Sequence, residues 1–352
     1  MENLEGMRDS FWTHKKVLLT GHTGFKGAWM SLCLSKMGAN VTGIALAPEG
    51  NPNLFQLLSL DVKNITADIR QPEAVKKAVR ETEPDIIIHM AAQALVRRSY
   101  RMPVETFSTN VMGTAHLLEA VKELAQPVTV LVVTSDKVYR NAESGNAFRE
   151  DDALGGDDPY SASKAAAEMV VHSWRASFPD AQSCIASARA GNVIGGGDFS
   201  EDRLIPDIYR SLVSGKELVL RYPQAVRPWQ HVLDTLFGYL TYIKALGAEG
   251  VPLALNFGPA KKEVVTVENV LRGFEQALGQ RVPHKIEAPT MPEKATLLLD
   301  TSLSEKTIKW KNRLAMDETV KWTADWYAGF HAGKNARQLC EKQFEEYCAR
   351  IT

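Results

Sequence analysis

The stretch KVLLTGHTGFKG at residues 16–27 decides the fold of this chain. Its opening letters, KVLLT, are an apolar run typical of a short buried strand, and a glycine-rich turn follows at once. Gly21, Gly24 and Gly27 have the spacing GxxGxxG, and the residues after them predict a helix that ends near Met37. A glycine turn between a strand and a helix is the setting in which backbone N–H groups bind a phosphate.

Each glycine of this turn has a role that requires a residue without a side chain. Gly21 permits the tight turn, Gly24 lets the backbone approach a pyrophosphate, and Gly27 lets the helix pack closely on the strand. The alternative is a glycine-rich turn that binds no ligand. The flanking strand and helix, with Asp68 downstream, favour a dinucleotide site instead.

Strands and helices alternate along the rest of the first half of the chain. This alternation predicts an α/β fold, a Rossmann-type doubly wound parallel sheet with right-handed crossovers. Strands are expected at 41–45, 62–66, 85–92, 128–134, 183–188 and 253–257, and helices at 72–82, 104–124 and 159–178.

The composition changes after residue 190, where glycine, proline and charged residues become frequent. We expect loops and short helices there that cover a cleft. Whether the tail packs on the body or on another subunit stays open. The expected division is a dinucleotide-binding domain at 1–190 to which 231–258 returns, a smaller mixed substrate lobe at 191–230 and 259–334, and a helical tail at 335–352.

The composition of the chain limits the kinds of partner that the protein can bind. The chain has 352 residues, 45% of them hydrophobic, and a net charge of −1, so it can bury a large core and has no electrostatic case for nucleic acid or membrane as its main partner. No apolar run approaches the ~20 residues of a membrane span. The N-terminal stretch MENLEGMRDSFWTHKK contains acids and lacks the apolar core of a signal peptide. The scattered cysteines are typical of reduced thiols in the cytoplasm, and we expect no metal site.

A second motif, DPYSASK at 158–164, places Tyr160 and Lys164 on one face of a helix, because they are four residues apart. A phenol has a pKa near ~10, and an adjacent ammonium favours the phenolate. Tyr160 could therefore take a proton from a sugar or alcohol hydroxyl near neutral pH. This spacing also occurs by chance on many surface helices. It indicates a catalytic pair here because the chain also contains a dinucleotide turn.

Ser135, Asp136 and Lys137 directly follow a buried strand in the motif TSDKVY at 134–139. In doubly wound sheets, ligands bind outside the carboxyl ends of the strands. A hydroxyl, a carboxyl and an amine with three different proton roles stand together there. The alternative, a polar strand exit with a helix cap, is common for Ser and Asp. The Tyr160–Lys164 pair favours a catalytic cluster.

The glycine spacing and the Tyr–Lys pair resemble the short-chain dehydrogenase/reductase superfamily. Longer motifs resemble its extended branch that acts on nucleotide sugars, in particular the CDP-glucose 4,6-dehydratases. A Ser-Asp-Lys triplet is the pattern of those enzymes, whereas relatives acting on dTDP-glucose carry Thr-Asp-Glu there. The motifs run in order along almost the whole chain: GHTGFKGAW at 21–29, HMAAQALVR at 89–97, STNVMGT at 108–114, TSDKVY at 134–139, DPYSASK at 158–164, ARAGNVIGGGD at 188–198 and RPWQHV at 227–232.

The resemblance implies a role for each reactive side chain. Tyr160, its pKa lowered by Lys164, removes the 4-OH proton while C4 passes hydride to NAD. Asp136 protonates the leaving 6-OH. Lys137 takes the position of the base at C5, either as a neutral amine or as a charged stabiliser of the enolate. Ser135 hydrogen-bonds the oxygen on C4. Return of hydride to C6 then gives a 4-keto-6-deoxy sugar.

The resemblance also implies NAD as the cofactor. One feature departs from the usual pattern: no acid follows the second strand, where residues 43–47 read GIALA, and no Arg or Lys there favours NADP. Asn110 resembles the residue that positions the catalytic lysine through water; the alternative is a helix-interior amide bonded to backbone. Asp68 resembles an adenine contact. The implied cofactor residues are Gly21, Thr23, Gly24, Phe25, Lys26, Gly27, Asp68, Ala91, Ala92, Gln93 and Asn110.

Asn192, Arg203 and Arg227 resemble residues that contact the diphosphate or the nucleotide, and a guanidinium suits bidentate phosphate binding. The expected partners are a CDP-sugar substrate and further copies of the chain, in a homodimer or homotetramer through helices 104–124 and 159–178. Alternatives on the same fold are another nucleotide-sugar dehydratase, a 4-epimerase or a non-catalytic NAD-binding scaffold. The Asp136–Lys137 pair argues against the epimerase, and the four intact reactive groups argue against the scaffold.

Overall fold

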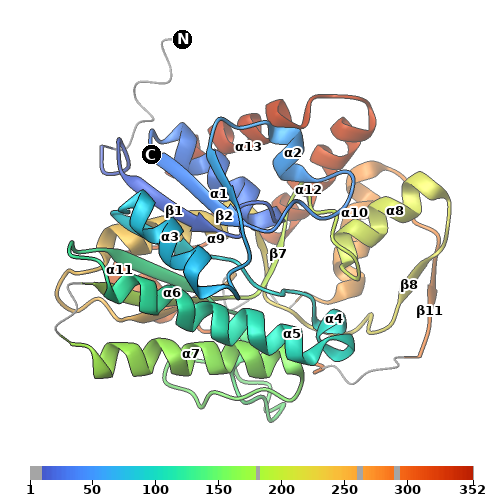
Figure 1. Ribbon diagram of the computed structural model, residues 1–352. Coiled ribbons are helices and arrows are strands. Elements are labelled where there is room, and N and C mark those ends of the chain that lie inside the picture. The colour runs from blue at the N-terminus through green and yellow to red at the C-terminus, as the bar shows by residue number, and fades with distance from the viewer. Residues whose placement is uncertain (1–9, 180–182, 260–264, 289–293, 352) are drawn as a thin grey trace.

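A parallel sheet with the strand order β10-β6-β5-β4-β1-β2-β3 forms the centre of the molecule (Figure 1). The computed structural model describes residues 10–179, 183–259, 265–288 and 294–351. Residues 1–9, the first part of the N-terminal stretch in which we expect no signal peptide, lie outside the described residues. The predicted doubly wound parallel sheet is confirmed. The strands are β1 (Lys16–Thr20), β2 (Asn40–Ala45), β3 (Lys63–Thr66), β4 (Ile86–His89), β5 (Thr129–Val133), β6 (Cys184–Ala190) and β10 (Ala254–Phe257).

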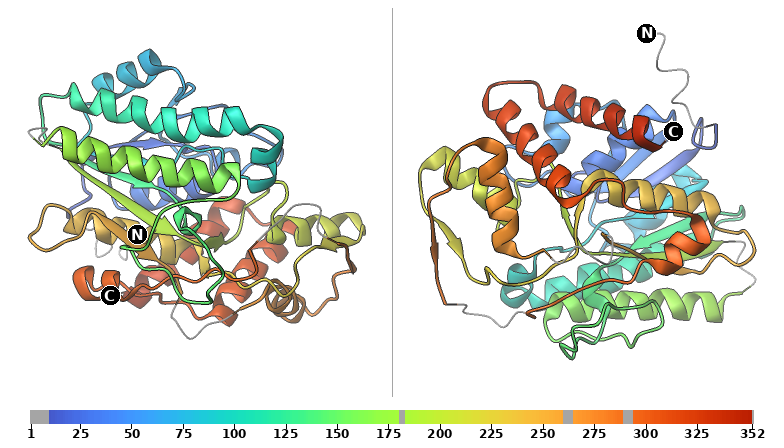
Figure 2. Two further views of the ribbon diagram at one scale, coloured as in Figure 1. Left: turned by 90° about the horizontal axis from the view of Figure 1, so that it is seen from below. Right: turned by 180° about the vertical axis from the view of Figure 1, so that it is seen from behind.

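Helices cover both faces of this sheet (Figures 1 and 2). Among those in the described part of the chain, none is both long and apolar enough to cross a membrane. The α-helices are α1 (Phe25–Lys36), α2 (Leu54–Leu58), α3 (Pro72–Thr82), α4 (Val96–Arg101), α5 (Pro103–Phe107), α6 (Gly113–Lys122), α7 (Pro159–Ser177), α8 (Leu204–Ser214), α9 (Val232–Ala245), α10 (Val267–Leu278), α11 (Ser302–Ile308), α12 (Met316–His331) and α13 (Ala336–Ile351).

Alternate residues of each strand point to opposite faces of the sheet. In β1, Leu18 packs into a core with α3, α6 and α7, whereas Val17 and Leu19 pack into a larger core with α1 and α9. All three are fully buried, so the strand is apolar throughout, as expected for a parallel strand covered on both sides.

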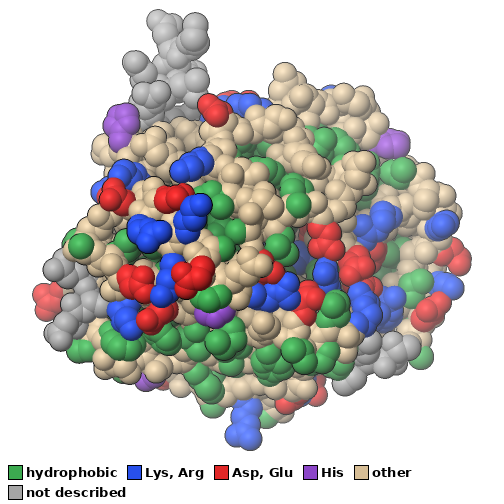
Figure 3. All heavy atoms as spheres, viewed as in Figure 1, with side chains coloured by type: hydrophobic (Ala, Val, Ile, Leu, Met, Phe, Trp, Pro, Cys, Tyr) green, Lys and Arg blue, Asp and Glu red, His purple; other side chains and the backbone are tan. Residues whose placement is uncertain are grey.

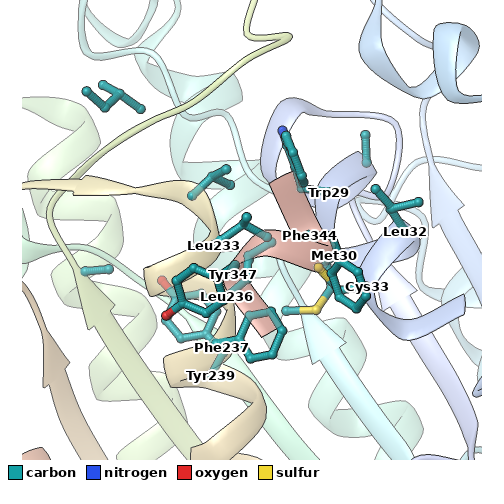
Figure 4. Close-up of a cluster of buried hydrophobic side chains, with 14 of the residues drawn as sticks. Trp29, Met30, Leu32, Cys33, Leu233, Leu236, Phe237, Tyr239, Phe344 and Tyr347 are labelled. Atoms are coloured by element: carbon teal, nitrogen blue, oxygen red, sulfur yellow. The ribbon is translucent and has the colours of Figure 1, made fainter. Parts of the chain in front are cut away.

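The larger core also holds the C-terminal helix. Figure 4 shows Trp29 and Cys33 of α1, Phe237 of α9 and Phe344 and Tyr347 of α13 in one buried cluster. The tail therefore packs on the body of its own chain. This answers the question that the sequence left open.

Helix α9 was not among the expected elements. Its sequence, VLDTLFGYLTYIKA, is apolar on nearly every side and most of its residues are buried. A helix surrounded by protein lacks the 3.6-residue alternation of apolar and polar residues, so periodicity does not reveal it.

The region after β6 contains two short parallel pairs besides α8. One pair is β7 (Asn192–Ile194) with β9 (Trp229–His231), and the other is β8 (Leu218–Leu220) with β11 (His284–Ile286). The sequence predicted loops and short helices here. Strands of three residues carry too few side chains for a pattern to show.

Two predicted elements differ from their predicted extent: one strand is shorter, and one helix is interrupted. Strand β4 stops at His89 instead of reaching residue 92. The Met90 N–H still reaches the Thr20 carbonyl of β1 at 3.2 Å, but the Ala91 N–H donates to the side chain of Thr20, Oγ1, at 3.0 Å. The long helix predicted at 104–124 is interrupted by a π turn, Ser108–Met112, between α5 and α6. Such turns frequently occur at functional sites.

The glycine turn brings β1, α1 and the exit of β4 into direct backbone contact. Gly21 has φ +76°, and a Cβ on it would lie 2.7 Å from Ala91 Cα. A Cβ on Gly27 would lie 2.1 Å from the Gly21 carbonyl oxygen, whereas the nearest atom to a Cβ on Gly24 is 3.5 Å away. Gly21 and Gly27 are therefore required by the fold, and Gly24 leaves its backbone open to a ligand.

We predict that Gly27→Ala destabilises the cofactor-free protein by about 2–3 kcal/mol, because the new methyl group overlaps backbone that cannot move aside. Gly24→Ala is the matched control and should cost about 1 kcal/mol or less, as a change of helix cap alone. Urea unfolding followed by circular dichroism measures both. Equal stability of the two variants would contradict the packing role of Gly27.

Candidate active site

A cleft of about 310 Å³ opens beyond the carboxyl ends of the central strands. The turn after β1, the exit of β5 and the start of α7 line one side, and residues from β7 to the start of α8 line the other. This is where doubly wound sheets bind ligands. The cleft brings together these predicted residues: Lys26, Ser135, Asp136, Lys137, Tyr160, Asn192, Arg203 and Arg227.

The Ser-Asp-Lys triplet forms a single turn at the end of β5. Ser135 Oγ accepts from the Lys137 backbone N–H at 3.2 Å and donates to Asp136 Oδ1 at 2.9 Å. Lys137 Nζ lies 3.4 Å from the same Oδ1. Asp136 is only 1% exposed, and its other oxygen, Oδ2, has no hydrogen-bond partner within the described residues. An acid and an amine are thus held in contact at the cleft.

Tyr160 and Lys164 stand one turn apart at the start of α7, as predicted from their spacing. The Lys164 ammonium is buried and donates to the Val133 carbonyl at 3.0 Å, at the end of β5. Burial, together with the nearby charge of Lys26, lowers the pKa of Lys164 to about 7, although Glu168 acts in the opposite direction. Lys164 therefore ties α7 to the strand after which Asp136 stands.

The expected lowering of the Tyr160 pKa by Lys164 is wrong for the protein without ligands. Burial raises the pKa of Tyr160 to about 12, and the Ser135 hydroxyl and Arg203 offset this only in part. Desolvation disfavours the phenolate more strongly than the surrounding groups favour it. A phenolate at Tyr160 needs a further positive charge in the cleft.

Lys26 is a cation of the cleft as well as part of the glycine turn. It lies in the first turn of α1, and burial lowers its pKa to about 8; Arg203 acts in the same direction and Asp136 opposes it. Its ammonium makes no hydrogen bond or ion pair with the part of the chain that the structure describes. The cleft also contains the basic residues Lys137, Arg203 and Arg227, which can bind an anionic ligand beside the carboxylates that line it.

Asn110, in the π turn, joins the loop after β4 to α7. Its Oδ1 accepts from the Gln93 N–H at 2.8 Å, and its Nδ2 donates to the Gln93 carbonyl at 3.0 Å and to Ser163 Oγ at 2.8 Å. Ser163 Oγ donates in turn to the Tyr160 carbonyl at 2.7 Å. The amide is bonded largely to backbone, which was the alternative interpretation, and this bonding positions the start of the catalytic helix.

His89 extends this connection to β1. Thr20 Oγ1 accepts N–H groups from Met90 and Ala91, so its single proton points to His89 Nδ1 at 2.8 Å. His89 Nε2–H then donates to Thr114 Oγ1 at 3.1 Å, and Thr114 donates to the Asn110 carbonyl at 2.7 Å. Burial lowers the pKa of His89 to about 3, and Lys164 acts in the same direction, so the ring stays neutral.

Glu168 anchors the other side of α7. Its two oxygens accept from Thr134 at 2.5 Å, Ser187 at 2.8 Å and the Arg189 guanidinium at 2.8 Å. Glu168 is almost fully buried, and hydrogen bonds and charge from Arg189 keep its pKa low despite the burial. Thr134 directly precedes Ser135, so this buried ion pair fixes the strand exit on which the reactive side chains stand.

The glycine turn fits a dinucleotide pyrophosphate. Gly24 is exposed, caps α1 without any side-chain hydrogen bond, and leaves the first N–H groups of the helix free to bind an anion. Thr23 is buried and donates to the Leu46 carbonyl at 3.1 Å, closing the turn against the end of β2. Phe25, Ala91, Ala92 and Gln93 lie beside this turn or in the loop after β4 that Gly21 touches.

The predicted cofactor site has an apolar residue where an acid usually follows the second strand. Leu46 follows β2 at the position of the missing acid, and 57% of its surface is exposed. Asp68, after β3, bonds its own neighbour Arg70 through backbone and guanidinium, which lowers its pKa. Neither Asp68 nor Asn110 lines the cleft. The adenine contact of Asp68 stays a prediction.

Sequence reasoning missed several residues of the cleft wall. Trp229 belongs to the buried core and also lines the cleft, and it donates its Nε1–H to the Val265 carbonyl at 3.2 Å. Arg97 closes the motif at 89–97 but received no role. An aromatic or basic residue at a motif boundary carries no signal of which way its side chain points. Further wall residues include Tyr100, Asp198, Asp202, Tyr222 and Val267.

Within the described residues no group of three or more His, Cys, Asp or Glu side chains could hold a metal ion. The fold, the glycine turn and the Tyr160–Lys164 pair define a dinucleotide-dependent enzyme of the short-chain dehydrogenase/reductase type. The sequence model of the family described as GDP-mannose 4,6 dehydratase matches residues 18–323, and the chain belongs to this family. The resemblance to the nucleotide-sugar dehydratases is confirmed.

Similar proteins include dehydratases and an epimerase. A CDP-glucose 4,6-dehydratase of Salmonella typhimurium is 40% identical over 97% of this chain and 99% of its own. A dTDP-glucose 4,6-dehydratase of Xanthomonas campestris pv. campestris is 27% identical over 88% of this chain and 92% of its own. The crystal structure of UDP-glucose 4-epimerase from Bifidobacterium longum in complex with NAD+ and UDP has a TM-score of 0.80 at 23% identity, covering 90% of this chain and 99% of that one.

We predict that Glu168→Gln lowers the free energy of unfolding by about 3–5 kcal/mol, because Arg189 loses its buried counter-ion. The exposed pair Lys321–Asp325 is the control, and Asp325→Asn should cost about 0.5 kcal/mol or less. Urea unfolding at neutral pH measures both variants. A loss at Glu168 no larger than that at Asp325 would refute the anchoring role.

Proposed function

We propose that this chain converts CDP-glucose to CDP-4-keto-6-deoxyglucose and water, as a CDP-glucose 4,6-dehydratase. One observation carries the proposal: a dehydrogenase pair, Tyr160 and Lys164, and an elimination pair, Asp136 and Lys137, are built around a single cleft. An epimerase or a simple dehydrogenase needs only the first pair. The 40% identical relative supports CDP as the nucleotide.

NAD, when bound, would supply the acceptor for the hydride that leaves C4 and the donor for the hydride that returns to C6. Gly21, Gly24 and the start of α1 would hold its pyrophosphate, and Lys26 adds a positive charge there. Tyr160 takes the proton of the 4-hydroxyl. An oxidised nicotinamide ring in the cleft would supply the positive charge that a Tyr160 phenolate lacks in the ligand-free protein.

The contact between Asp136 and Lys137 suggests how acid and base arise together. A proton passed from Lys137 Nζ to Asp136 Oδ1, 3.4 Å away, yields a neutral amine and a carboxylic acid without changing the charge of the site. The amine then removes the proton at C5, which the 4-keto group acidifies, and the acid protonates the leaving 6-hydroxyl. This uses Lys137 as the base.

The substrate diphosphate faces the other side of the cleft. Arg227 is buried and donates to the Val226 and Ala295 carbonyls at 2.8 and 3.3 Å, and Arg203 lies 3.2 Å from Asp198. These bonds fix both guanidinium groups at the cleft wall. Asn192 also lines the cleft, and its buried Oδ1 has no partner among the described residues. We assign these three residues to nucleotide-diphosphate binding.

The test supplies CDP-glucose deuterated at C4 together with less than one equivalent of NAD. We expect mass spectrometry to show loss of one water with the label recovered at C6, and no net NADH, because the hydride stays within one active site. Tyr160→Phe should remain folded and transfer no label. Labelled NADH released in stoichiometric amount would mean an ordinary oxidoreductase. Faster turnover of dTDP-glucose or a GDP-sugar would refute the CDP preference.

A homodimer through α5–α6 and α7 is part of the same proposal. These helices pack together, and their outer surface exposes Val104 to 80%, Met169 to 56% and Met112 to 49%. Figure 3 shows hydrophobic side chains gathered along the lower edge of this face, over these helices. A contiguous apolar surface of this kind marks an interface.

A cytoplasmic location is also part of the proposal. The free cysteines support it, because thiols stay reduced in the cytoplasm.

We predict that Val104→Asp/Met169→Glu turns the dimer into a monomer in sedimentation velocity, because two charges per subunit would be buried without partners. Ile286→Glu, at an equally exposed residue of β11, is the control and should leave the mass unchanged. A wild-type protein that sediments as a monomer would contradict the interface, and a tetramer would show that a second surface is used.

A further inference from the structure

Two buried polar atoms near the active site lack hydrogen-bond partners within the described residues. One is Oδ2 of Asp136 and the other is the hydroxyl of Tyr239. Asp136 is 1% exposed and Tyr239 is 0% exposed. One atom accepts hydrogen bonds and the other donates one. Buried polar groups are nearly always paired, with protein or with ordered water, so each orphan needs an explanation.

The fold places the two residues close together. Tyr239 belongs to α9, which packs against β5, and Asp136 follows β5 at its carboxyl end. Burial raises the pKa of Tyr239 far above its usual value, and the nearby Tyr160 and Asp136 raise it further. The phenol of Tyr239 therefore keeps its proton and always acts as a donor.

Tyr239 is also held rigidly. Its ring packs edge-on against Phe257 of β10, with 5.3 Å between the centroids. The next tyrosine of the same helix, Tyr242, uses its hydroxyl in an ordinary structural way and donates to the Pro252 carbonyl at 2.6 Å. The hydroxyl of Tyr239, in contrast, has no hydrogen-bond partner within the described residues.

We propose that Tyr239 is a positioning residue for the acid: its hydroxyl donates, through one buried water, to Oδ2 of Asp136. This bond keeps Oδ2 an acceptor, so the transferable proton resides on Oδ1. Oδ1 is the oxygen beside Ser135 and Lys137 at the cleft. The inference rests on the proposed function, because it assigns Asp136 the protonation of the 6-hydroxyl. No bond is made or broken at Tyr239 itself.

Removal of this hydroxyl has a specific consequence. The proton of Asp136 could then sit on either oxygen, and protonation of the leaving group would slow. Oxidation at C4 depends on Tyr160 and Lys164 and would proceed as before. Reduced cofactor would therefore accumulate during turnover, whereas loss of packing would weaken both steps together.

The experiment compares Tyr239→Phe with Tyr242→Phe in the NAD-loaded enzyme. We expect Tyr239→Phe to lower kcat about tenfold with KM unchanged, because a positioning residue contributes about as much as one hydrogen bond. Stopped-flow absorbance should show transient NADH in this variant and not in Tyr242→Phe. In an Asp136→Asn background, Tyr239→Phe should cause no further loss, because its effect passes through Asp136.

Three outcomes would overturn the inference: wild-type kcat in Tyr239→Phe, slowing without NADH accumulation, or additive losses in the double variant. A crystal structure of the wild type supplies a test that does not depend on any variant folding. It should show a water within hydrogen-bond distance of both atoms, and a dry gap would refute the proposal. Failure of the wild-type enzyme to dehydrate CDP-glucose would instead reject the proposed function.

Discussion

Asn110 joins the two parts of the site that different segments of the chain supply. Its side chain holds the backbone of Gln93, in the loop that the glycine turn touches, and also Ser163 in the helix of Tyr160. The π turn determines which way this side chain points, and Thr114 satisfies the Asn110 carbonyl there. The geometry between cofactor turn and catalytic tyrosine therefore depends on one buried amide.

The site derives its electrostatic character from desolvation. Burial raises the pKa of Tyr160 and lowers those of Lys164 and Lys26, so the ligand-free protein holds its reactive groups nearer their neutral forms. Glu168 and Arg189 are kept ionised by their mutual bonds, and so they stay behind the strand as structure. Charges carried by bound ligands change the balance in the cleft, because the low dielectric makes each added charge act strongly.

Much of the fold could be predicted because its signals are local. KVLLT and the GxxGxxG spacing identify β1 and the start of α1, and Pro72–Thr82 forms the helix predicted at the same residues. The prediction failed where tertiary contacts override local pattern. Helix α9 is apolar on most sides because protein surrounds it, and β4 ends early, at His89, after which the Ala91 N–H donates to the Thr20 side chain.

The sequence by itself determined the chemistry of the site: a glycine turn for a dinucleotide, Tyr160 and Lys164 on one helix face, and Asp136 beside Lys137. These are short-range relations, fixed by helix geometry and chain order. Only the tertiary structure decided that Lys26 enters the cleft, that burial raises the pKa of Tyr160, and that the hydroxyl of Tyr239 is buried near Asp136. Burial and the approach of distant segments depend on packing of the whole chain, which no local spacing encodes.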